Sequence, residues 1–169
     1  MMIAKITRKI RKILPLKPCG AVIVAAGNAT RMGGIDKVMA PIDGEAMILR
    51  TVRAFQQSDV IREIVIVSRQ DLLEQIMDLC SEFDKVRAVL LGGSDRPESV
   101  RIGLQALSEN MKLVAVHDGA RPFVTWQVID RVVRAANTYA AAAPGIPVKD
   151  TVKVVEGGVV RSTPARKTL

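Results

Sequence analysis

The sequence predicts an α/β domain: a three-layer sandwich built on a mostly parallel sheet, with a protruding β-hairpin arm. Two observations predict the sandwich. Short apolar runs alternate with helix-period segments from residue 20 onward, and the runs are continuously apolar, as in parallel strands buried on both faces. A third observation predicts the arm, because valines flank Gly157 and Gly158 in a segment that breaks the alternation.

The expected elements follow from these patterns in chain order. Strands are predicted over residues 21–26, 63–68, 87–91, 112–117 and 140–148, and helices over 46–57, 71–82, 97–109 and 125–138. Asp71 with Glu74 resembles a capping box for the second helix, and Ser94 or Asp95 could cap the third. The hairpin arm is predicted at about 151–165. The whole arrangement is Rossmann-like.

Charge divides the chain into a basic leader, residues 1–18, and a domain, residues 19–169. Six of the 25 Lys and Arg residues precede residue 20, where there is no acid, which leaves 19 basic against 17 acidic residues in the remainder. The leader has isoleucines at helical spacing, and such a helix could lie on an acidic membrane or on nucleic acid. We favour a loosely packed or solvated tail, because short isolated helices are marginal in water.

Composition excludes several classes of protein. The domain is nearly neutral and aromatic residues make up only 3% of the chain, so nucleic-acid binding is not expected. The two cysteines, Cys19 and Cys80, exclude a disulfide framework and a four-cysteine zinc site, and favour a reducing, cytoplasmic setting. His117 is the only histidine, which excludes a histidine-based metal site; it is predicted to be a partly buried residue satisfied by hydrogen bonds.

A loop of small residues follows the first predicted strand. Ala25, Ala26 and Gly27 begin it, and Arg31 and Lys37 add two cations. Small residues let backbone amides approach an anion closely, and cations strengthen such a site, so the loop favours a polyphosphate. It matches neither the dinucleotide nor the Walker fingerprint.

Two further strand ends carry polar residues. Gly93 follows the third strand, and the helix start after it offers backbone amides to a base or phosphate, with Ser99 one turn inside. Asp118 ends the fourth strand, where a carboxylate is placed to bind Mg²⁺. Ligands of parallel sheets bind beyond the carboxyl ends of strands, so these loops are expected to form one site.

Four segments carry a resemblance to a known family. "AAGNATRMGG" followed by "DK" resembles the signature loop of nucleotidyltransferases, and "GGSDRPESV", "HDGARPFV" and "VKDTVK" narrow the resemblance to the 2-C-methyl-D-erythritol 4-phosphate cytidylyltransferases. It covers residues 20–169. It implies cytidylyl transfer from CTP to 2-C-methyl-D-erythritol 4-phosphate, with release of pyrophosphate, in non-mevalonate isoprenoid biosynthesis.

The resemblance also implies roles for individual residues. Arg31 and Lys37 match the catalytic cations, and Asp118 matches the carboxylate on the Mg²⁺ side. Positions that bind CTP match Ala25, Ala26, Gly27, Gly93 and Ser99. Positions that bind the acceptor or phosphate match Thr151, Arg121 and Arg166, the last supplied across a homodimer interface through the arm.

Two departures and two alternatives accompany this interpretation. Ser94 stands where the family usually has an acid, and the family's sequence continues for several dozen residues, so we expect a fragment or a longer natural chain. The first alternative is a cytidylyltransferase for another polyol phosphate, such as ribitol 5-phosphate. The second is a nucleotide-binding module without turnover.

Overall fold

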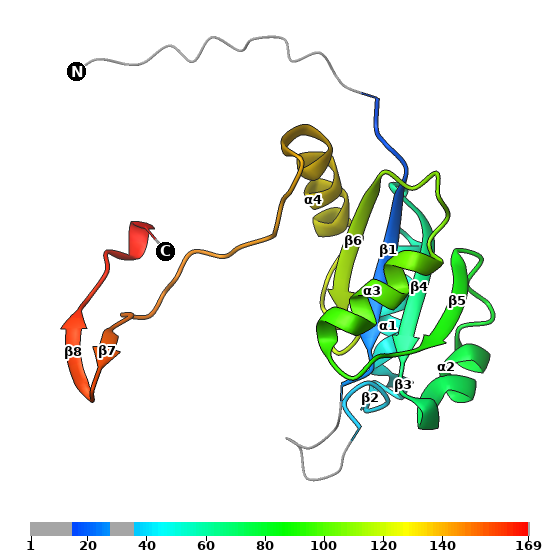
Figure 1. Cartoon of the computed structure of the whole chain (residues 1–169), viewed down its shortest axis with the longest axis horizontal. Coiled ribbons are helices and arrows are strands. Elements are labelled where there is room, and N and C mark those ends of the chain that lie inside the picture. Colours follow the sequence, from blue (N-terminus) through cyan, green and yellow to red (C-terminus); the bar gives the residue numbers. More distant parts are fainter. Residues whose placement is uncertain (1–14, 28–35, 169) are drawn as a thin grey trace.

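A four-stranded, wholly parallel sheet forms the centre of the computed structural model, which describes residues 15–27 and 36–168 (Figure 1). Its strands lie in the order β5, β4, β1, β6. They are β1 (Cys19–Ala25), β4 (Ile61–Ser68), β5 (Val86–Leu91) and β6 (Leu113–Asp118). In the register, Ala21 of β1 lies opposite Ile64 of β4 and Ala115 of β6. Four of the predicted strands are therefore confirmed.

Helices cover both faces of this sheet, which confirms the three-layer sandwich. One face carries α1 (Met47–Gln56), α2 (Leu73–Leu79) and α4 (Trp126–Tyr139), and the other carries α3 (Arg96–Ala106). Successive residues of β1 divide between the two cores. Ile23 is buried with Ile48, Ile76 and Ile129, whereas Val22 is buried with residues from the α3 side. The period of two along a strand produces this division.

The helix that follows β4 begins differently from the prediction. A 3-10 turn, η2 (Gln70–Leu72), precedes α2, and no side chain caps α2. The predicted capping box is wrong because the Asp71 carboxylate instead accepts hydrogen bonds from Arg69 Nε at 3.0 Å and Nη2 at 2.8 Å. The Asp95 cap is confirmed, since its carboxylate accepts a hydrogen bond from the Glu98 amide at 2.8 Å.

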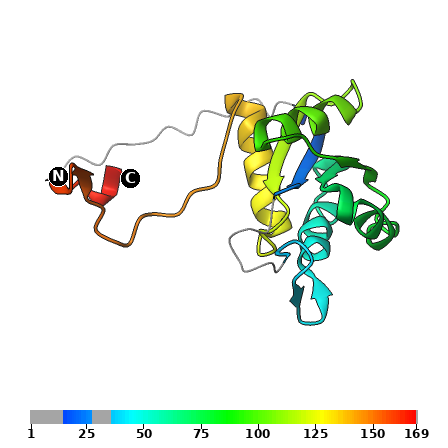
Figure 2. The same ribbon diagram turned by 60° about the horizontal axis from the view of Figure 1, so that its bottom comes forward.

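A small hairpin that the sequence analysis did not predict precedes α1. It consists of β2 (Pro41–Ile42) and β3 (Glu45–Ala46), joined by Asp43 and Gly44 at φ of 51° and 82°. Asp-Gly is a strong signal for such a turn, but strands of two residues leave no hydrophobic pattern to detect. Figure 2 shows this hairpin projecting from the end of the sheet at which β1 finishes.

Residues 140–148, predicted as a strand, form an irregular extended segment instead. The helix α4 ends at Tyr139, the C-cap residue Ala140 has a φ of 71°, and residues 140–147 are exposed. Alanine, proline and glycine dominate this run, and they have little preference for strands. Among the described residues no strand pairs with it. Figure 1 shows the segment leading away from the sheet.

The predicted arm is confirmed as a separate antiparallel hairpin. It consists of β7 (Val154–Glu156) and β8 (Val159–Ser162), and a 3-10 turn, η3 (Arg166–Thr168), follows it. Gly157 and Gly158 have φ of 56° and 77°, the left-handed values that a tight hairpin turn requires. Its valines are exposed, and Figures 1 and 2 show the arm standing away from the sheet.

Most of the basic leader and Arg31 lie outside the described residues. The described end of the leader runs beside the end of α4, where the Lys17 amide donates to Asn137 Oδ1 at 3.2 Å. Within residues 15–27 and 36–168, no helix combines the length and the apolar character needed to cross a bilayer.

Candidate active site

A cavity of about 540 Å³ lies at the carboxyl end of the parallel sheet. Its walls come from the residues that follow β1, from the loop between β5 and α3, and from the end of β6. The cavity has the size of a small-molecule site. Seven of the predicted site residues line it: Ala25, Ala26, Gly27, Lys37, Gly93, Ser99 and Asp118. The structure thus brings together residues that lie up to about 90 positions apart, as the strand-end rule predicts.

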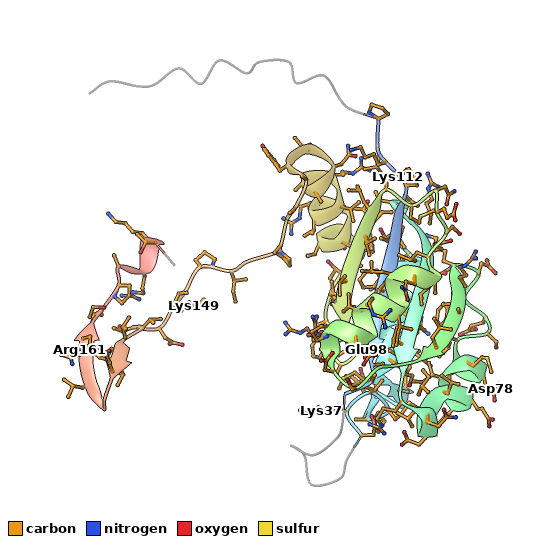
Figure 3. All side chains as sticks on the ribbon, in the orientation of Figure 1. Lys37, Asp78, Glu98, Lys112, Lys149 and Arg161 are labelled. Carbon is orange, nitrogen blue, oxygen red and sulfur yellow. The ribbon has the colours of Figure 1, made fainter. Side chains whose placement is uncertain are left out.

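Lys37 lies in a turn that leads from the first loop toward the β2–β3 hairpin. It is partly buried, and no hydrogen bond or ion pair to another described residue engages its ammonium group. Figure 3 shows Lys37 and Glu98 at one end of the sheet and Lys112 at the opposite end. The position of Lys37 beside the cavity suits a cation that binds phosphate.

Gly92 allows the end of β5 to approach the end of β1. A Cβ atom at this position would lie 2.4 Å from Cβ of Ala26 and 3.0 Å from Oγ of Ser99. Both neighbours line the cavity. Because Gly92 has no side chain, Ala26 and Ser99 can lie this close together, and their separation sets the width of the cavity between the first loop and α3.

The loop between β5 and α3 already satisfies several of its own amides. The Gly93 amide donates to Oγ of Ser99 at 3.2 Å, and that hydroxyl donates to the Asp95 carbonyl at 2.9 Å. The Glu98 carboxylate accepts the amide and the hydroxyl of Ser94, both at 2.8 Å. These bonds lower the pKa of Glu98. The expectation of free amides is wrong for Gly93, Ser94 and Glu98, because each of these amides already donates to a side chain of the same segment.

Asp118 lies between two arginines. Its Oδ1 accepts from Nη2 of Arg96 at 2.9 Å, and its Oδ2 forms an ion pair with Nε of Arg121 at 2.8 Å. Burial raises the pKa of Asp118, but the hydrogen bonds and charges of the two arginines outweigh it, so the pKa lies below its ordinary value. Asp118 is therefore ionised at neutral pH and holds both guanidinium groups beside the cavity.

The predicted Mg²⁺ role of Asp118 fits the groups that are present. In the described ranges, no cluster of three or more His, Cys, Asp or Glu side chains forms a closed metal site. Mg²⁺ at phosphate-transfer sites commonly uses one or two carboxylates together with substrate phosphates and water. Within the described residues Oδ2 of Asp118 has only the ion pair with Arg121, so it keeps a lone pair for a cation.

Thr151 and Arg166 do not join the cavity of their own chain. Both are exposed on the arm, and the Arg166 guanidinium donates to the Lys149 carbonyl at 2.8 Å. Figure 3 shows the arm, labelled at Lys149 and Arg161, well away from the sheet. Any role of these residues at the cavity therefore requires another copy of the chain or a different placement of the arm.

Three charged residues at the site escaped the sequence analysis. Arg96 lines the cavity and binds Asp118. Asp36 also lines the cavity, and Arg69 binds Asp36. Arg96 could have been found, because it lies in the quoted segment "GGSDRPESV" after a strand end. Arg69 gave no signal, since Gly27 and Asp36, the residues that it bonds at the site, lie far from it in the sequence.

Of the other reactive side chains, Cys19 and Cys80 are buried in the core and His117 is partly buried. Burial raises the pKa of both the Cys19 and the Cys80 thiols to about 11, so neither thiol is a nucleophile at neutral pH. His117 packs against Phe55 with ring centroids 5.2 Å apart. Its buried Nδ1 has no hydrogen-bond partner in the described part of the chain, so the prediction of a satisfied histidine is wrong for this atom.

The chain is similar to known proteins of one family. The family model for 2-C-methyl-D-erythritol 4-phosphate cytidylyltransferase matches residues 19–169. A cytidylyltransferase of that name from Caldanaerobacter subterraneus subsp. tengcongensis is 38% identical over 154 residues, which are 88% of this chain and 68% of the relative. One from Symbiobacterium thermophilum is 40% identical over 154 residues, covering 90% of this chain and 64% of the relative.

Solved structures give the same result. The 4-diphosphocytidyl-2C-methyl-D-erythritol synthase of Anaerococcus prevotii is similar with a TM-score of 0.76 and 28% identity, over 89% of this chain and 65% of that one. The 2-C-methyl-D-erythritol 4-phosphate cytidylyltransferase of Thermus thermophilus has a TM-score of 0.62 and 27% identity, over 88% and 64%. The chain thus spans about two thirds of the length of the relatives it matches.

Proposed function

The chain belongs to the 2-C-methyl-D-erythritol 4-phosphate cytidylyltransferase family, and on that premise we propose that it transfers a cytidylyl group from CTP to 2-C-methyl-D-erythritol 4-phosphate. The observation that carries the proposal is the cavity, where Lys37 and Arg96 lie in the walls together with Asp118. Lys37 lies between β1 and β2, and Arg96 begins α3 after β5, so cations from two different loops meet at one cavity. Such an arrangement suits a polyphosphate. Membership of the family supplies the identity of the base and the acceptor.

The reaction needs little covalent chemistry from the protein. An oxygen of the acceptor phosphate attacks the α-phosphorus of CTP, a new phosphorus–oxygen bond forms, and the bond to the β-phosphate breaks as pyrophosphate leaves. Catalysis then consists of positioning and charge neutralisation. Lys37 binds the phosphates from one wall, and Arg96, oriented by Asp118, binds them from the other. Arg121 does not line the cavity, but it also pairs with Asp118 and keeps its predicted role in binding phosphate. Arg31 lies outside the described residues and keeps its predicted role as a second catalytic cation.

Mg²⁺ belongs to the same proposal. Asp118 is the protein carboxylate that would hold it, next to the phosphates of CTP. When bound, the ion neutralises charge that develops on the phosphate oxygens. The bonds from Arg96 and Arg121 keep the Asp118 carboxylate ionised and fixed in direction.

A homodimer through the arm is the second part of the proposal. The arm packs on no described part of its own sheet, and five of its valines are 38–59% exposed: Val152, Val154, Val155, Val159 and Val160. Apolar surface of this kind is typical of an interface. In a dimer, Thr151 and Arg166 would reach the acceptor at the neighbouring cavity.

We further propose a cytoplasmic setting without a nucleic-acid partner, supported by free buried thiols and the nearly neutral domain.

The function is tested by substituting Lys37. The full chain is incubated with CTP, Mg²⁺ and 2-C-methyl-D-erythritol 4-phosphate, and pyrophosphate release is measured. Lys37→Ala should lower turnover by about 10²–10³-fold, because it removes one charge stabiliser from the transferring phosphates. Lys112→Ala is the matched control, since Lys112 is an exposed lysine at the opposite end of the sheet. Near-normal turnover of Lys37→Ala would refute the assignment.

The same assay separates the alternative functions. Faster turnover with ribitol 5-phosphate than with 2-C-methyl-D-erythritol 4-phosphate would favour the other polyol phosphate. CTP binding without pyrophosphate release from either acceptor would favour the nucleotide-binding module.

A further inference from the structure

Arg69 connects the two chain segments on either side of residues 28–35. It follows β4, and its Nη1 donates to the carbonyl of Gly27 at 3.1 Å. Its Nη2 donates to Oδ2 of Asp36 at 2.5 Å. Asp71 holds the same guanidinium from the outside through both carboxylate oxygens. One side chain thus joins Gly27, which follows β1, to Asp36, which precedes the β2–β3 hairpin.

Asp36 bonds both Arg69 and the backbone that follows Lys37. While its Oδ2 accepts from Arg69, its Oδ1 accepts from the backbone amide of Val38 at 2.9 Å and from that of Met39 at 3.4 Å. The Asp36 side chain therefore closes a turn with Lys37 inside it. Val38 is buried, and its carbonyl accepts the amide of Ile48 in α1 at 2.9 Å. The backbone of Lys37 is held on both sides.

The chemistry of the contact requires an arginine. The side chains of Arg69 and Asp36 are each only 19% exposed, so their ion pair is screened less than a surface pair. A planar guanidinium donates in several fixed directions at once, here to a carbonyl and to two carboxylates. The compact ammonium of a lysine cannot reach all three. Within the described residues, no other side chain bonds both Gly27 and Asp36.

We propose that Arg69 is a positioning residue of the nucleotidyl-transfer site: it fixes Gly27 relative to Asp36 and thereby holds Lys37 at the wall of the cavity. The inference rests on the proposed function, because it assigns Arg69 a purpose through Lys37. Arg69 itself is not among the residues that line the cavity, so it acts on substrate through other residues.

The test compares Arg69→Lys and Asp36→Asn with Arg53→Lys in the full chain. Arg53 is a matched control, because it also forms an arginine–carboxylate pair, with Glu45 of the β2–β3 hairpin, but bonds neither Gly27 nor Asp36. Turnover, KM for CTP and the urea midpoint are measured for each variant. In parallel, hydrogen exchange of the Val38 and Met39 amides is followed in the protein without substrate.

Arg69→Lys should lower kcat/KM for CTP on the order of 10²-fold, because displacements of about 1 Å at a reacting site have that effect. Asp36→Asn should do the same, and the double variant should lose no more than either single variant, because the two residues act as a unit. Exchange at Val38 and Met39 should accelerate in both. Arg53→Lys should leave kcat/KM within about twofold of the unchanged chain.

The outcomes distinguish this inference from the proposed function. If the unchanged chain releases pyrophosphate and Arg69→Lys and Asp36→Asn do so equally well, the inference is wrong and the function stands. If the unchanged chain neither binds CTP nor releases pyrophosphate, the function fails, and the exchange of Val38 and Met39 still decides whether Arg69 holds the turn. A urea midpoint that falls in parallel with activity, with unchanged exchange at these amides, would show a purely structural role and overturn the inference. If Arg69→Lys does not fold, Asp36→Asn carries the comparison.

Discussion

Gly92→Ala tests whether the close approach of two strand ends sets the geometry of the cavity. The added Cβ would lie 2.4 Å from Cβ of Ala26, whereas ordinary contacts begin at 3.4 Å, so the two segments would have to separate by about 1 Å. Ser99 and Val67, at 3.0 and 3.3 Å, hinder movement of the new methyl group in other directions. Neither neighbour can turn aside, because both are almost completely buried.

The expected cost has two parts. Overpacking of this kind destabilises a domain by about 1–3 kcal/mol. Displacement of Ala26 by about 1 Å at a site that works by positioning should lower kcat/KM for CTP on the order of 10²-fold. Urea unfolding measures the first part, and pyrophosphate release at subsaturating CTP measures the second.

Gly145→Ala is the control for this experiment. Nothing lies within 4 Å of a Cβ at Gly145, and its φ is not in the left-handed region, so the variant should stay within about 0.5 kcal/mol of the unchanged chain. If Gly92→Ala behaves like Gly145→Ala in both assays, the reasoning about the cavity is refuted.

Two further predictions concern pH and assembly. Burial lowers the pKa of His117 below 6.5, so the unfolded chain binds a proton that the folded chain does not. The free energy of unfolding should therefore fall as the pH decreases below about 6.5, and urea titrations at several pH values should show a smaller fall for His117→Gln; equal falls would contradict the prediction. If the arm completes a neighbouring cavity, Lys37→Ala and Arg166→Ala should each be nearly inactive alone, whereas refolding them together should restore about a quarter of the activity, because half of the dimers are mixed and each has one intact site. No recovery above the separate variants would contradict exchange of arms.

Much of the fold could be predicted from the sequence because it depends on short-range patterns. Continuous apolar runs marked β1, β4, β5 and β6, and helical periodicity marked α1, α3 and α4 within a few residues of their observed bounds. Residues 140–148 do not form the predicted strand, because a strand also needs a partner and no described strand pairs with this segment. Two-residue strands such as β2 and β3 are too short for any pattern.

The candidate site, like the fold, could be predicted from the sequence only in part. Its place was predictable, because parallel strands present their carboxyl ends at one edge, and this rule brought Ala26, Gly93 and Asp118 to one cavity. The partner of each charged side chain was not predictable. Asp71 was expected to cap a helix, yet it binds Arg69, which reaches across 33 positions to Asp36.

The sequence by itself determined the order of the strands and helices along the chain, the arm and the loops that carry the site, because hydrophobic period and turn residues act over a few positions. Only the tertiary structure decided which charges meet. Arg96 and Arg121 pair with Asp118, and Arg69 pairs with Asp36, because folding brings these side chains together in space. Ion pairs depend on distance and desolvation, and neither is encoded in the spacing of residues along the chain.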